Sequence, residues 1–176
     1  MTPDYGEDIL VRKKEIYDGA IPVGNSVTMM NLLRLARMTG NPEFEEKAAQ
    51  IERAFAGDVR RSPVTFTQFM IAVDFAEGPS YEIVIAEKPE AEDTKNMLRA
   101  LRKHFIPNKV VLFRPTEEEA SEIVKLAEVT QYLSSQEGKA AAYICHNYQC
   151  GLPTTDVGEM LNLLNVKEKK EVGNEK

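Results

Sequence analysis

The stretch YEIVIAE, residues 81–87, decides the fold class because the spacing of apolar residues changes there. It is short, rich in β-branched residues and bounded by Pro79 and Pro89, features that predict a buried β-strand. The stretches KVVLFR at 109–114 and AAAYIC at 140–145 predict two further strands. Helical spacing separates the three strands and follows the last of them, so the second half of the chain is predicted to alternate strand and helix.

Three segments carry the helical spacing in this half. The first is Thr94–Phe105, the second follows a capping box at 116–119, and the third begins at Asp156. Alternating strands and helices favour parallel pairing through right-handed crossovers. We therefore expect a small α/β domain over residues 80–166, built as a three-stranded parallel βαβαβα layer. The charged residues 167–176 are predicted to be a disordered tail.

The residues before Pro79 predict helices. Apolar residues recur at helical spacing in three segments, and Gly40 with Asn41-Pro42 marks a short connection between the first two. Asn25 or Ser26 is predicted to cap the first helix. Residues 1–79 are thus expected to form an N-terminal helical hairpin segment packed against the α/β layer, which makes the chain α/β by element order and α+β overall.

Composition excludes several classes of protein. The chain has 176 residues, of which 43 % are hydrophobic and 28 % charged, as in an average globular protein. A net charge of −6 argues against nucleic acid or an anionic membrane as the partner. No apolar run is long enough to span a bilayer, and the first residues lack the apolar region of a signal peptide, so we expect a cytoplasmic protein.

No cofactor is predicted. The strand at 81–87 runs into Glu87-Lys88-Pro89-Glu90, which has no glycine-rich phosphate loop and carries acidic residues, so a bound nucleotide is not expected there.

The strand at 140–145 runs into the segment Cys145–Pro153, which holds both cysteines of the chain. Cys145 and Cys150 could form a disulfide, half of a metal site or a redox pair. The favoured interpretation is two reduced structural cysteines, because free cysteine is usually buried. A zinc site would need every Cys and His of the chain, namely Cys145, His146, Cys150 and His104. Neighbouring strand residues point to opposite faces, so Cys145 and His146 should not converge on a metal, and no metal site is predicted.

The polar loop Asp18–Ser26 is the other candidate site. A turn followed by a helix cap explains its glycine, asparagine and serine. In the alternative interpretation, Asp18 or Asn25 faces a cleft and binds hydroxyl groups or transfers a proton. A single carboxylate is weak support for glycoside hydrolysis, which usually needs two.

Two signatures resemble a known family, the large thioredoxin-domain proteins that include the spermatogenesis-associated thioredoxin-like proteins. The first signature comprises Gly6-Glu7-Asp8, Val11-Arg12, Lys14–Pro22, Gly24–Val27 and Asn31–Ala36, and the second comprises Ala142–Cys145, Asn147, Cys150, Leu152-Pro153 and Thr155-Asp156. The resemblance implies a thioredoxin domain followed by a helical toroid similar to six-hairpin glycosidases, with this chain as the C-terminal portion. Residues 1–79 would then be the last hairpins of the toroid.

The thioredoxin domain and most of the toroid are absent from these 176 residues. One or two hairpins cannot enclose a sugar, so the resemblance implies a non-catalytic fragment or split-gene product. Such a module would act in docking or structure, through a companion chain that carries the missing parts or through self-association. The alternative is a carbohydrate-active enzyme that uses Asp18 and Asn25, or a thiol-redox enzyme that uses Cys145 and Cys150.

Overall fold

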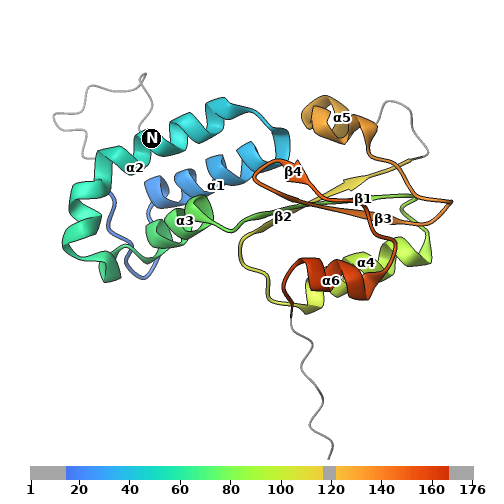
Figure 1. Ribbon diagram of the computed structural model, residues 1–176. Helices are drawn as coiled ribbons and strands as arrows, with labels where there is room; N and C mark the ends of the chain where they lie inside the picture. The colour runs from blue at the N-terminus through green and yellow to red at the C-terminus, as the bar shows by residue number, and fades with distance from the viewer. Residues whose placement is uncertain (1–14, 117–121, 167–176) are drawn as a thin grey trace, which may run out of the picture. The chain divides into compact units, whose positions relative to one another are not determined.

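The computed structural model describes residues 15–116 and 122–166 (Figure 1). The predicted tail at 167–176, the start of the first signature and most of the capping box predicted at 116–119 lie outside these residues. Contacts group the chain into two compact units that divide between Ser80 and Tyr81, and each is described by itself. In neither described range is a helix long and apolar enough to cross a membrane.

The first unit contains the predicted helical hairpin. Helices α1 (Gly24–Thr39) and α2 (Pro42–Arg61) are joined at Gly40, whose φ of 72° is the left-handed conformation that ends a helix. Asn41 caps α2 by accepting a hydrogen bond from the backbone N–H of Glu43 at 3.0 Å. A short 3₁₀ turn, η1 (Pro63–Thr65), leads into α3 (Thr67–Glu77). The fully buried core side chains of this unit include Met29, Ala36, Ala48, Phe69 and Phe75.

The predicted cap of α1 is wrong. Val23 holds the N-cap position, and its side chain makes no capping bond. Asn25 and Ser26 lie inside the first turn. The physical reason is that the helix already begins at Gly24 and both side chains have other partners: the Ser26 hydroxyl donates to Asp18 Oδ2, and the Asn25 amide donates to the carbonyl of Glu15.

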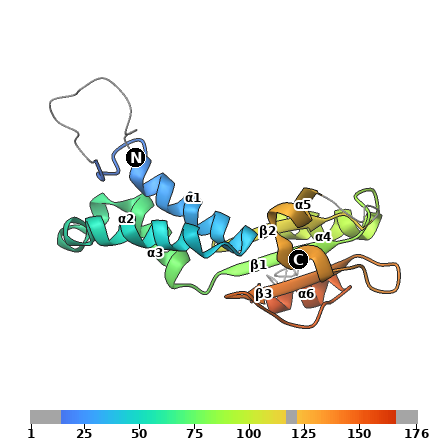
Figure 2. The same ribbon diagram turned by 90° about the horizontal axis from the view of Figure 1, so that it is seen from above.

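The second unit is a mixed sheet of four strands, not the all-parallel layer of three that the sequence predicts. Strands β1 (Tyr81–Ala86), β2 (Lys109–Arg114), β3 (Ala141–His146) and β4 (Gln149–Cys150) lie in the order β2-β1-β3-β4. Figure 2 shows β1 between β2 and β3. Strands β1 and β2 are parallel and joined through α4 (Glu92–Lys103), as predicted, whereas β3 runs antiparallel to β1.

A tight turn precedes β3. Between β2 and β3 the described chain contains α5 (Glu122–Leu126) and the 3₁₀ helix η2 (Glu128–Tyr132). Gln136 and Lys139 then pair across a turn through two backbone hydrogen bonds. The chain enters β3 from this turn and runs antiparallel to β1, so the parallel crossover that the sequence predicts here is not formed.

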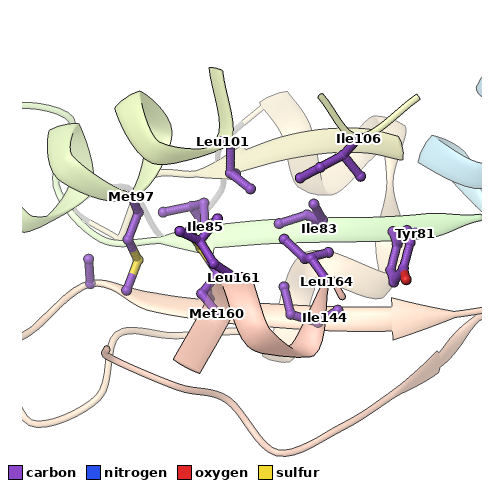
Figure 3. Close-up of a cluster of buried hydrophobic side chains, with 12 residues drawn as sticks. Tyr81, Ile83, Ile85, Met97, Leu101, Ile106, Ile144, Met160, Leu161 and Leu164 are labelled. Carbon is purple, nitrogen blue, oxygen red and sulfur yellow. The ribbon is translucent and has the colours of Figure 1, made fainter. Parts of the chain in front are cut away.

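The core of the second unit lies on one face of the sheet (Figure 3). Tyr81, Ile83 and Ile85 alternate along β1 and meet α4 and α6 (Val157–Leu163). The cluster comprises Tyr81, Ile83, Ile85, Met97, Leu101, Ile106, Ala140, Ala142, Ile144, Met160, Leu161 and Leu164. Helix α5 lies over the other face (Figure 1), and all six residues of β1 are buried.

Helix α4 ends earlier than the sequence predicts. It stops at Lys103, and His104 already has an extended backbone. Phe105, which the helical spacing assigns to the apolar face, is therefore 91 % exposed.

Candidate functional site

Asp18 lies in the loop before α1 and is buried, with 7 % of the residue exposed. Its Oδ1 accepts a hydrogen bond from the backbone N–H of Val23 at 3.0 Å. Its Oδ2 accepts one from the Ser26 hydroxyl at 3.2 Å and one from the backbone N–H of Phe69 at 3.0 Å. Both oxygens are thus engaged by donors from the protein.

The three donors belong to two helix starts. Val23 is the N-cap residue of α1 and Ser26 lies in its first turn, whereas Phe69 lies in the first turn of α3, which has no side-chain cap of its own. First-turn N–H groups have no partner within their own helix, and a carboxylate there complements the helix dipole. Asp18 therefore joins both helix starts, and its backbone N–H adds a bond to the carbonyl of Thr65 at 3.2 Å.

Asn25 points elsewhere. Its amide nitrogen donates to the backbone carbonyl of Glu15 at 2.5 Å, an exposed contact. The structure thus gives Asp18 and Asn25 different partners, and a role for either in binding sugar stays a prediction.

Cys145 and Cys150 form a disulfide, with their Cα atoms 3.9 Å apart. They are paired residues of the antiparallel strands β3 and β4. Of the three arrangements that the sequence left open for these thiols, the structure contains the bonded one, so the favoured interpretation of reduced cysteines is wrong. Cys145 is buried and Cys150 is exposed.

A hairpin that the sequence does not predict brings the two sulfur atoms together. Its two-residue loop is Asn147-Tyr148, with φ angles of 48° and 65°. Positive φ at both positions is typical of the tight turns that join antiparallel strands. Asn147 is the residue that indicates a turn in the sequence, because asparagine tolerates a positive φ. Tyr148 does not indicate one, because tyrosine rarely adopts this conformation. The turn is held by the Tyr148 N–H, which donates to Glu82 Oε2 at 3.2 Å.

The histidines do not join the cysteines. His146 lies beside Cys145 on β3, and its ring packs against that of Tyr81 with centroids 4.3 Å apart, on the other face of the sheet. His104 Nδ1 is 2.9 Å from the carbonyl oxygen of Ala100. The expected divergence of Cys145 and His146 is confirmed, and within the described residues no group of three or more potential ligands could hold a metal ion.

The disulfide gives a direct prediction. Reduction should lower the free energy of unfolding by about 2 kcal/mol, because the bond closes a loop with a sequence separation of 5 and so restricts the unfolded chain. Denaturant titration with and without reductant measures this change. In the double variant Cys145→Ser/Cys150→Ser, the reductant should have no effect. Thiol titration of the native protein should find no free thiol before reduction, and two reactive thiols at that stage would contradict the pairing.

The carboxyl ends of β1 and β2, where α/β sheets usually hold ligands, carry Glu87 and Arg114. The Glu87 N–H donates to the Arg114 carbonyl at 3.2 Å, and Arg114 Nε donates to the carbonyl of Thr130. Glu87 is buried, and its Oε2 has no hydrogen-bond partner among the residues described. The hydrogen bond between Glu87 and Arg114 continues the pairing of β1 with β2 by one residue.

The second unit also has a groove of about 420 Å³ between α4 and β2. Leu98, Leu101, Val111 and Phe113 provide an apolar floor, and Arg102 and Lys109 add two cations. Burial lowers the pKa of the Lys109 ammonium below its ordinary value, because desolvation disfavours the charged form.

Fold and site together define a protein with a helical hairpin unit followed by a mixed α/β unit. In the first unit the Asp18 carboxylate joins two helix starts, and in the second the Cys145–Cys150 disulfide joins two strands. Known proteins with a similar sequence are much longer than this chain, which matches one segment of them. The chain is 34 % identical to spermatogenesis-associated protein 20 of Rattus norvegicus over 161 residues, which is 92 % of this chain and 20 % of the relative.

The Homo sapiens protein of the same name is 32 % identical over the same share of each chain, and an uncharacterised protein of Caenorhabditis elegans is 29 % identical over 160 residues. The chain is therefore homologous to one segment of spermatogenesis-associated protein 20, and it spans about a fifth of the length of these relatives. No family model matches the chain, and no solved structure gives a significant match.

Proposed function

We propose that this chain is a non-catalytic docking or structural module of a thioredoxin and six-hairpin-glycosidase-like system. The observation that carries the proposal is the engagement of Asp18. A sugar-facing acid or base needs an oxygen available to substrate, whereas both Asp18 oxygens already accept hydrogen bonds that stabilise two helix starts.

The partner in this proposal is a companion polypeptide that carries the thioredoxin and toroid parts, and self-association is its alternative. The support is the coverage of the relatives, which have about four fifths of their length outside the matched segment. In relatives of that size the matched segment has covalently attached neighbours. Residues 1–79 would represent the last hairpins of the toroid, and residues 80–166 its appendage.

Exposed apolar side chains add support. Ile21 and Val64 in the first unit are each 82 % exposed, and Leu152 in the second is 90 % exposed. Large apolar side chains that contact little of their own unit are available to a partner.

The experiment measures mass in solution. The purified chain is analysed by light scattering alone and after coexpression with the companion polypeptide. A dimer, or a one-to-one complex with the companion, is the expected result. A strict monomer that binds no hydrophobic dye and leaves the companion free would contradict the proposal.

One observation favours thiol redox chemistry as a second candidate function. The disulfide joins a buried sulfur on β3 to an exposed residue on β4, so an external thiol can approach Cys150. Two electrons and two protons would convert the bond into two thiols. A reduction potential within the range of cytosolic dithiols, measured against glutathione, would support this candidate, and a bond that glutathione leaves intact would remove it.

A further inference from the structure

The long edge of the sheet lies at β2. In the order β2-β1-β3-β4, β2 pairs only with β1, and along the described chain no strand lies on its other side. Its register with β1 covers all six residues from Lys109 to Arg114. An apolar edge of this length is a surface on which another strand can pair.

The hydrogen bonds of β2 show which backbone groups face outward. The carbonyls of Asn108 and Arg114 accept bonds from the N–H groups of Tyr81 and Glu87, at 2.8 and 3.2 Å. Backbone groups alternate in direction along a strand, so the N–H and C=O groups of the odd-numbered residues, among them Val111, point away from β1. An added strand would find these donors and acceptors free of sheet bonds.

The side chains of the same odd-numbered residues line the groove. Lys109, Val111 and Phe113 share the sheet face that α4 covers, and with Leu98 of α4 they border the edge. Val111 and Phe113 are only partly buried against the core cluster. Alternate side chains of an added strand would therefore enter an apolar groove at the point where its backbone pairs.

Charge defines the occupant more closely. Arg102 and Lys109 are the charged residues that line the groove, and no carboxylate does so in the described part of the chain. The Lys109 ammonium donates to the carbonyl of Ile106 at 3.2 Å, and its partial burial lowers its pKa; a bound carboxylate would offset this desolvation cost. A second copy of β2 does not supply one, because the sequence KVVLFR has two cations and no acid.

We infer that the edge of β2 and the adjoining groove bind an extended polypeptide segment that adds a strand to the sheet, places alternate apolar side chains against Val111 and Phe113, and pairs a carboxylate with Arg102 and Lys109. This inference rests on the proposed docking function and names the chemistry of the partner segment.

The probe is a fluorescein-labelled peptide of alternating valine and threonine with two aspartates at one end. A matched peptide has lysines in place of the aspartates. Fluorescence anisotropy with the full chain should give an affinity about ten-fold higher for the acidic peptide, since one desolvated charge pair is worth about this factor. Backbone NMR shifts should be largest in β2 and α4.

Arg102→Glu should abolish the preference between the two peptides, because Arg102 lines the groove and the substitution leaves one carboxylate beside the Lys109 ammonium, with no net charge. Lys103→Glu is the matched control, with the same charge change on the same helix outside the groove lining, and should leave the preference unchanged. Val111→Pro removes an outward N–H without removing a bond to β1, and should weaken binding of both peptides.

Equal affinities for the two peptides, shifts that map to another surface, or a preference that Arg102→Glu leaves unchanged would overturn the inference. Companion binding that persists in Arg102→Glu and Val111→Pro would also overturn it and would leave the proposed docking function intact. If the chain is a strict monomer that does not bind the companion but does bind the acidic peptide at β2, the proposed function is contradicted and the inferred peptide site is supported.

Discussion

Asp18→Ala should lower the free energy of unfolding of the first unit by about 3 kcal/mol or more. The substitution removes a charged acceptor of three hydrogen bonds, each worth about 1.5–3 kcal/mol when considered singly. It also leaves the backbone N–H of Phe69 without an acceptor in a residue that is 1 % exposed. Chemical denaturation followed by circular dichroism measures the loss, and hydrogen exchange of the Val23 and Phe69 amides locates it.

Two variants calibrate this result. Ser26→Ala removes one of the three donors and should cost about 1 kcal/mol. Asp18→Asn keeps one acceptor oxygen but presents an amide donor to groups that are themselves donors, so its cost should lie between those of Ser26→Ala and Asp18→Ala. Unchanged stability and unchanged amide protection in Asp18→Ala would show that the carboxylate does not hold the helix starts together.

Ile85→Ala should destabilise the second unit by about 3–4 kcal/mol. Ile85 lies on the central strand β1, has no exposed surface, and contacts the cluster formed with α4 and α6 (Figure 3). Truncation removes three buried carbon atoms. It leaves a cavity that cannot close fully, because the neighbouring strands are fixed by their pairing. The same denaturation experiment measures the change.

Val111→Ala is the matched control on the edge strand. Val111 is only partly buried, so its truncation should cost about 1 kcal/mol or less. Ile85→Val should cost about 1 kcal/mol, because it deletes a single methylene. A loss in Ile85→Ala no larger than that in Val111→Ala would contradict the position of the core on the α4 and α6 face.

Local patterns were sufficient for the helical hairpin and for the parallel pair β1-β2. In both, residues near in sequence carry the signal: Gly40 and Asn41-Pro42 mark the helix connection, and the apolar face of 94–103 forms the crossover. The predicted direction of β3 was wrong because alternating strands and helices favour parallel pairing, whereas the chain enters β3 from a turn at 136–139 that the alternation does not reveal.

The candidate site shows the same division between near and distant partners. Ser26 lies eight residues from Asp18 in the same loop region, so the sequence of the loop alone could suggest this hydrogen bond. The Phe69 N–H lies 51 residues away, and nothing in the sequence marks a backbone donor as the partner of a carboxylate. The pairing of Cys145 with Cys150 required the turn at Asn147-Tyr148, and the tyrosine there departs from the residue preference of such turns.

The unequal edges of the sheet have a consequence for assembly. At one end β2 offers six residues, and at the other β4 offers two. Copies that stacked head to tail into a filament would have to join the long edge of each copy to the short edge of the next, where only two residues could pair. The polymerisation that threatens proteins with open sheets is therefore limited in this fold by the shortness of β4, and strand addition at β2 favours complexes of fixed size.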